Sequence, residues 1–151
     1  MTGELNETQM NNILSSQAIG RLACTDGKCP YIIPMTYTFD GNYIYGQTFE
    51  GKKLDILRKN PNTCFQVDIV ADIYNWQSVI VYGRFEELVG EKSNEARDIL
   101  FTRVLPLMTS SSIHHHEHAV GISQEISDEN RIKPVMFKIR INEKTGRFDK
   151  F

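Results

Sequence analysis

The feature that most constrains the fold is a series of short apolar stretches with a period of two, joined by glycine-containing turns. The clearest stretch is residues 31–39, where every second side chain from Tyr31 to Phe39 is apolar or aromatic. This is the pattern of a strand with one buried face. Asp40-Gly41-Asn42 follows directly and is typical of a tight turn into another strand. Because such short turns join antiparallel neighbours, parallel βαβ winding is disfavoured.

The whole sequence divides into about six strands and three helices. Strands are expected at residues 19–25, 31–39, 43–48, 63–68, 76–88 and 135–141. Helices are expected at residues 6–14, 52–60 and 92–108, where apolar residues recur at helical spacing. Sequential antiparallel strands with few helices close most readily into a small barrel. The sequence therefore predicts a mainly β fold with flanking helices, a six-stranded antiparallel barrel formed by a single domain over residues 1–151.

Composition limits the class of protein and its partners. The chain has 151 residues, 40% hydrophobic and 24% charged, so one domain can form a core without disulfides or metals. Its 17 basic and 19 acidic residues give a formal charge of -2, so neither nucleic acid nor a membrane surface is expected as a partner. The first residues lack the basic start and apolar run of a signal peptide. We expect a cytoplasmic protein.

The first candidate site is Gly51-Lys52-Lys53, at the expected start of a helix. Free backbone N–H groups at a helix start attract anions, whereas lysine there is unfavourable against the helix dipole. A bound phosphate would relieve that conflict. The alternative is an ordinary solvated lysine pair, since Asp55 follows on the same helix. The spacing is not that of a Walker P-loop.

The second candidate site is the strand expected at residues 76–88. Trp76, Ser78 and Ile80 share one face of this strand, while Val79 and Val81 share the other. A hydroxyl among aromatic and apolar side chains suits the wall of a ligand site. A half-buried sheet surface explains the same alternation, and both interpretations stay open.

Pro34 interrupts the strand expected at residues 31–39. Proline has no N–H group to donate to a neighbouring strand. At this point the strand is therefore expected to be an edge, to be bulged, or to open toward a ligand.

Five segments of the sequence follow one another in a distinctive order. They are Ile33-Pro34-Met35-Thr36-Tyr37, Tyr45-Gly46-Gln47-Thr48-Phe49-Glu50-Gly51-Lys52-Lys53, Asn60-Pro61, Trp76-Gln77-Ser78-Val79 and Gly83-Arg84. This succession resembles the pyridoxamine 5′-phosphate oxidase-related FMN-binding split-barrel family, over about residues 10 to 148. It is most similar to the branch of nitroimidazole-resistance proteins, whose last strand leads into a segment like Thr145-Gly146-Arg147.

The resemblance implies a split barrel that binds FMN at four groups of residues. In that family one strand lies along the isoalloxazine ring, a second strand end continues the flavin wall, basic residues hold the phosphate, and a polar position on a later strand reaches the cofactor. The matching positions here are, in that order, Pro34, Met35, Thr36 and Tyr37; Gly46, Gln47 and Thr48; Lys52 and Lys53; and Trp76 with Ser78. The family's flavin lies between two subunits, so the resemblance also implies a homodimer.

Cysteine and histidine are the remaining candidates for redox or metal chemistry. Cys24, Cys29 and Cys64 are odd in number and form no Cys-x-x-Cys motif, so reduced thiols are expected. Four imidazoles occur close together, at His114, His115, His116 and His118. They could belong to a solvated polar loop, contact the flavin edge or substrate of a neighbouring subunit, or coordinate a metal or haem.

The leading hypothesis for function is an FMN-dependent oxidoreductase of a small molecule, such as a nitro-aromatic compound. No side chain stands out as an acid, base or nucleophile. The family's true oxidases carry a C-terminal Trp followed by an Arg-Leu-His segment, whereas Trp76 is the sole tryptophan here, so pyridoxamine 5′-phosphate oxidation is not expected. The alternatives are a flavin-binding module without turnover, and a haem- or metal-handling protein that uses the histidine cluster.

Overall fold

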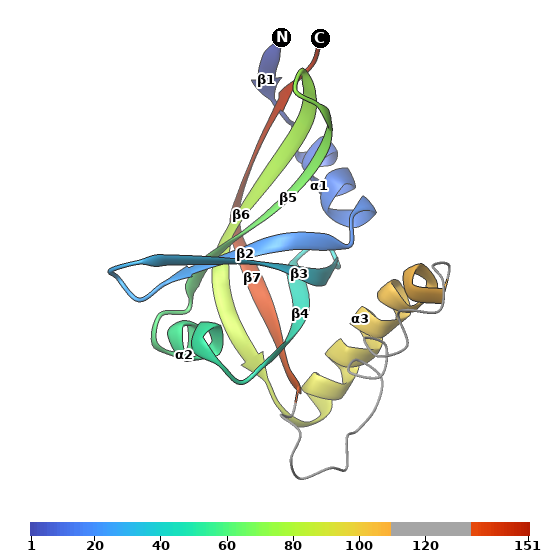
Figure 1. Ribbon diagram of the computed structural model, residues 1–151. Helices are drawn as coiled ribbons and strands as arrows, with labels where there is room; N and C mark the ends of the chain where they lie inside the picture. Colours follow the sequence, from blue (N-terminus) through green and yellow to red (C-terminus); the bar gives the residue numbers. More distant parts are fainter. Residues whose placement is uncertain (110–133) are drawn as a thin grey trace.

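The computed structural model describes residues 1–109 and 134–151. Within these residues the strands form one antiparallel sheet that closes into a barrel, with three helices packed around it (Figure 1). The strands are β1 (Thr2–Glu4), β2 (Ile19–Thr25), β3 (Pro30–Phe39), β4 (Tyr43–Phe49), β5 (Asn62–Asp72), β6 (Asn75–Leu88) and β7 (Pro134–Asp149). The helices are α1 (Glu7–Ser16), α2 (Lys52–Lys59) and α3 (Gly90–Thr109). The predicted antiparallel barrel with flanking helices is confirmed.

Closure of the barrel depends on the pairing of β6 with β7. The strand order is β1-β7-β4-β3-β2-β5-β6, and β6 also pairs with β7, from Trp76 opposite Asp149 to Leu88 opposite Met136. The six strands from β7 to β6 therefore form a closed ring, and β1 is added beside the end of β7. The register shifts once, just after Tyr82. A bulge there lets two long strands bend around the barrel.

The main core lies inside the barrel and against α1. Tyr37 and Phe65 meet edge to face at its centre, with ring centroids 5.1 Å apart. The Tyr37 hydroxyl donates a hydrogen bond of 2.6 Å to the carbonyl oxygen of Leu14. Because both groups are buried, this bond ties β3 firmly to α1.

The helices α1 and α2 begin in contrasting ways. At α1 the side chains and backbone N–H groups of Asn6 and Gln9 form the predicted capping box, with both hydrogen bonds 2.9 Å long. At α2 the first turn follows Gly51, and no side chain of a described residue caps it. The helix ends at Lys59, two residues before Pro61, close to the predicted end.

Two parts of the sheet differ from the sequence prediction. The sequence does not predict β1, and it ends the last strand at Ile141 although β7 continues to Asp149. β1 has only three residues and pairs with the distant end of β7. Both segments are largely polar, so no alternating apolar pattern marks them as strands. They are extended because they pair with neighbouring strands.

The helix α3 packs on the outside of the barrel, as a separate apolar layer. It buries Ala96, Leu100 and Val104 against Leu88 of β6 and Met136 of β7. The helix predicted at residues 92–108 is therefore confirmed, with slightly wider bounds. No helix among the described residues is long and apolar enough to cross a membrane.

Candidate functional site

The sheet is split between β3 and β4. Residues 37–39 of β3 pair with β4, whereas residues 30–36 pair only with β2 among the described residues. β4 pairs with β7 along its whole length, and beyond Gly46 β7 is its sole partner strand among the described residues. Pro34 therefore lies on an open edge of β3, which confirms the expectation from its missing N–H group. Backbone groups on this edge are not used by a neighbouring described strand.

The start of α2 lies beside the first half of β3. The Lys52 ammonium is 5.1 Å from the centroid of the Tyr31 ring. Lys53 is half-buried, and this burial lowers the pKa of its ammonium, an effect that the nearby Cys24 thiol opposes. Neither lysine forms an ion pair with a described residue. Two ammonium groups thus lie at a helix start where the described part of the chain supplies neither an ion-pair partner nor a side-chain cap, an arrangement that favours an anion.

Four of the residues predicted to bind a cofactor point into the barrel. Met35 is partly buried against the core, and the other three are more fully enclosed. Tyr37 is 0% exposed and Thr48 2% exposed. A Cβ atom on Gly46 would lie 2.6 Å from the Phe137 ring, so close packing requires glycine there. A ligand outside the barrel would therefore contact these three residues through their backbone. Gln47, between two inward-facing neighbours, faces outward and is half-buried.

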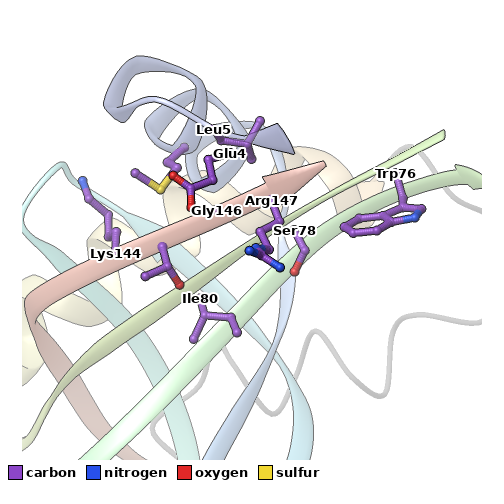
Figure 2. A pocket seen from close by; sticks show the side chains of 10 residues that line it. Glu4, Leu5, Trp76, Ser78, Ile80, Lys144, Gly146 and Arg147 are labelled. Atoms are coloured by element: carbon purple, nitrogen blue, oxygen red, sulfur yellow. The ribbon is translucent and has the colours of Figure 1, made fainter. Parts of the chain in front are cut away.

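Trp76 and Ser78 lie in a different place, on the outer face of the barrel at the start of β6 (Figure 2). With Ile80 they line an open pocket of about 610 Å³. The other lining residues come from the β1–α1 segment and from β7, and are Glu4, Leu5, Met10, Lys144, Thr145, Gly146 and Arg147. The Ser78 hydroxyl accepts a 3.0 Å hydrogen bond from the Gln66 amide, so its own O–H group is free to donate elsewhere.

The structure does not bring these two groups of predicted residues together within one chain. Ser78 lies near the start of β6, whereas Glu87, near its end, contacts α2 through Arg58. The two positions are nine residues apart on this strand, and at about 3.3 Å per residue they are separated by roughly 30 Å. The lysines at α2 and the Trp76 pocket therefore lie toward opposite ends of the barrel (Figure 1).

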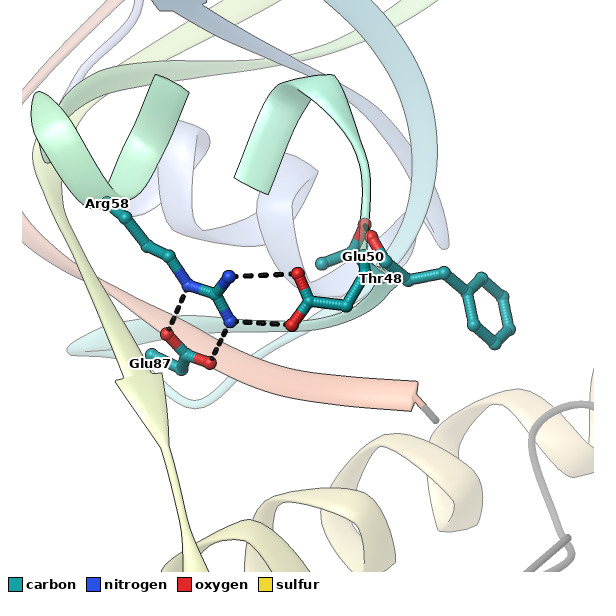
Figure 3. A network of polar contacts seen from close by, with 5 residues as sticks. Thr48, Glu50, Arg58 and Glu87 are labelled. Carbon is teal, nitrogen blue, oxygen red and sulfur yellow. Dashed lines mark hydrogen bonds and ion pairs between the residues drawn. The ribbon is translucent and has the colours of Figure 1, made fainter. Parts of the chain in front are cut away.

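A network around Arg58 fixes the turn that leads into α2 (Figure 3). The guanidinium donates two hydrogen bonds of 2.8 Å to Glu50, and two of 3.0 and 2.8 Å to Glu87. These bonds from Arg58 lower the pKa of the Glu87 carboxyl. The sequence analysis missed this network. Glu50 and Arg58 are not at helical contact spacing, and Glu87 comes from a distant strand, so no local signal marks it.

The remaining candidates for redox or metal chemistry are cysteine and histidine. His114, His115, His116 and His118 lie outside the described residues. Within the described residues, no group of three or more His, Cys, Asp or Glu side chains is placed to hold a metal ion. The three cysteines are free thiols, as expected.

Residues 6–147 match the protein family described as pyridoxamine 5′-phosphate oxidase. The chain belongs to this family. A relative, the uncharacterized protein RA0666 of Rhizobium meliloti, is 34% identical over 84 residues, which are 56% of each chain. The chain thus spans about half the length of that relative.

Solved structures show the same fold along the whole chain. An FAD-binding protein of Mesorhizobium loti superposes with a TM-score of 0.76 and 25% identity, covering 99% of both chains. A protein assigned to 5-nitroimidazole antibiotic resistance in Bacteroides thetaiotaomicron superposes with a TM-score of 0.71 and 19% identity, covering 98% of this chain and 87% of that one. The resemblance to the oxidase-related split-barrel family and the split-barrel fold are confirmed.

Replacing Glu87 with Gln should lower the stability of the protein near neutral pH and have a smaller effect near pH 3. Because Arg58 holds the pKa of Glu87 below its ordinary value, the ionised carboxylate contributes stability that is complete above the unfolded pKa of about 4.3. This contribution is lost as the pH falls through the lower, folded pKa. Thermal unfolding of both proteins at the two pH values measures it, with the exposed Glu91→Gln as control. An equal difference in Tm at both pH values would contradict the assignment.

Proposed function

We propose that this protein binds a flavin, with the flavin phosphate at the start of α2, and acts as an FMN-dependent oxidoreductase of a small molecule. The observation that carries the proposal is the pair of ammonium groups, Lys52 and Lys53, at a helix start beside the open edge of β3, where no described residue forms an ion pair with them or caps the helix with its side chain. A phosphate would accept hydrogen bonds from both ammonium groups and from the first N–H groups of α2. It would also offset the cost of burying the charge of Lys53.

The split between β3 and β4 supports the same proposal. The flat ring system of a flavin would lie along the open edge of β3, near the outward-facing Pro34, Thr36 and Gln47. When bound, a flavin supplies the redox chemistry, and the protein supplies binding and orientation. Membership of the oxidase family and the likeness to an FAD-binding protein of Mesorhizobium loti are consistent with a flavin ligand. FMN is the flavin that we propose, and FAD is the alternative.

We further propose a homodimer in which Trp76 and Ser78 of one chain complete the flavin site of the other. Two observations support it. The two groups of site residues are too far apart in one chain for a single flavin to touch both. In addition, the outer face of the sheet leaves Ile19, Ile32 and Val70 exposed, at 61%, 64% and 64%. Exposed apolar surface of this kind is typical of an interface, and a two-fold axis would present it on both subunits.

Replacing Lys52 and Lys53 together with Ala should weaken FMN binding at least tenfold and riboflavin binding far less. Only FMN carries the phosphate, and one hydrogen bond to a charged group is worth about 1.5–3 kcal/mol. Quenching of flavin fluorescence on titration with apoprotein measures both affinities. Lys59→Ala, at the other end of α2, is the matched control. Equal weakening of both ligands would contradict the phosphate site, and a wild-type protein that binds none of FMN, FAD and riboflavin would contradict the flavin proposal.

Mixing two defective variants should restore flavin binding if the site is shared between subunits. One variant carries Lys52→Ala and Lys53→Ala, and the other carries Trp76→Ala. A mixed dimer has one site in which all these residues are intact, so random reassociation restores about one quarter of the sites. FMN bound per chain after co-refolding measures the recovery, and sedimentation gives the oligomeric state. A mixture that binds no more FMN than the separate variants would contradict the shared site.

The bound flavin should turn over if the protein is an oxidoreductase. Under anaerobic conditions, NADH or NADPH is expected to bleach the absorbance of the bound flavin, because it transfers a hydride to the ring. A nitroimidazole added afterwards should restore the absorbance as it accepts the electrons. Free FMN at equal concentration is the control. Bound flavin that neither donor reduces would instead support a flavin-binding module without turnover.

A further inference from the structure

The carboxylate of Glu50, close before the two lysines in the sequence, binds an arginine of α2. Glu50 directly precedes Gly51, the residue at which α2 begins. Its carboxylate accepts two hydrogen bonds, each 2.8 Å long, from Arg58 in the last turn of α2 (Figure 3). It is therefore engaged with Arg58, and no ion pair among the described residues joins it to Lys52 or Lys53.

An unrestrained Glu50 carboxylate would favour a different position. Acidic side chains are stabilised near a helix start by the helix dipole and its free N–H groups. Lys52 and Lys53 would add two positive charges at that place. A side chain tethered next to the helix start competes with a free anion at high effective concentration. Glu50 is thus an internal competitor for the anion site unless another group holds it.

Glu87 gives Arg58 the orientation that this restraint needs. Its carboxylate accepts hydrogen bonds from Nε and from Nη2 of Arg58, at 3.0 and 2.8 Å. The guanidinium is planar, so fixing one of its edges on Glu87 directs the other edge at Glu50. Glu87 belongs to β6, which is part of the closed barrel. Its contact with Arg58 therefore anchors α2 to the barrel independently of the turn between β4 and α2.

We propose that Arg58 is a positioning residue for the phosphate site, which keeps the Glu50 carboxylate out of the helix start and uses Glu87 as its fixed support. The inference rests on the proposed function, because the anion concerned is the flavin phosphate. It assigns Arg58 no contact with the ligand. Its effect is carried by the charge of Glu50.

A double-mutant cycle separates this role from a merely structural one. Arg58→Gln frees Glu50, so the preference for FMN over riboflavin should fall about tenfold or more, with riboflavin affinity little changed. Removing the competing charge in the double variant Glu50→Gln/Arg58→Gln should restore the preference to within about threefold of wild type. Glu50→Gln alone should also stay within about threefold, since in the wild type its carboxylate is already held away.

Controls keep the result interpretable if Arg58→Gln unfolds. Arg58→Lys retains the charge but loses the paired hydrogen bonds, so its FMN preference should fall between those of the wild type and Arg58→Gln. Arg97→Gln, on α3, tests for loss of a partly exposed arginine elsewhere. Far-UV circular dichroism confirms the fold of each variant.

Three outcomes would overturn the inference. The double variant could be as defective as Arg58→Gln, which would assign Arg58 a structural role alone. Folded Arg58→Gln and Arg58→Lys proteins could keep the full FMN preference, which would leave Glu50 without influence on the site. In both cases a wild-type preference for FMN would leave the phosphate proposal intact. A wild-type protein without that preference would overturn both proposals.

Discussion

The pairing of β6 with β7 is the constraint on which the rest of the structure depends. It occupies one side of β7 over nearly its whole length. The other side of β7 is shared by β4 in its first half and by β1 at its end. Because β4 follows β7 from Tyr43 to Phe49, it leaves β3 after Gly46. The split beside Pro34 is therefore a consequence of barrel closure, and the open edge comes from the global pairing pattern.

The candidate site residues lie in two regions of the barrel, the start of α2 and the Trp76 pocket. The start of α2 lies against the β2–β3 hairpin, and among the described residues its lysines form no ion pair, while the neighbouring acid, Glu50, is bound to Arg58. The Trp76 pocket lies toward the other end of the long β6 strand. A shared site between two copies of the chain is one arrangement in which both regions can serve a single ligand, and the exposed apolar sheet face is compatible with it.

Several positions named by the family resemblance have a second explanation in packing. Tyr37 is buried and bonded to Leu14, and Gly46 lies against Phe137. These residues would be required by the barrel whether or not a ligand binds. Motif similarity at such positions is evidence for the fold. Lys52 and Lys53 bear on the proposed ligand, because no ion pair with a described residue balances their charges at a helix start.

By itself the sequence determined the barrel, the positions of the helices, the capping box of α1, the edge at Pro34 and the family, since each depends on local spacing or on a single residue's backbone chemistry. It also pointed to Lys52 and Lys53 as candidates for an anion site, with an ordinary solvated lysine pair as the alternative, because helix starts have a fixed polarity. Only the tertiary structure decided which strand leaves the sheet, that Trp76 lies far from those lysines, and that Arg58 joins Glu50 to Glu87. These depend on contacts between segments distant in sequence, which no local periodicity records.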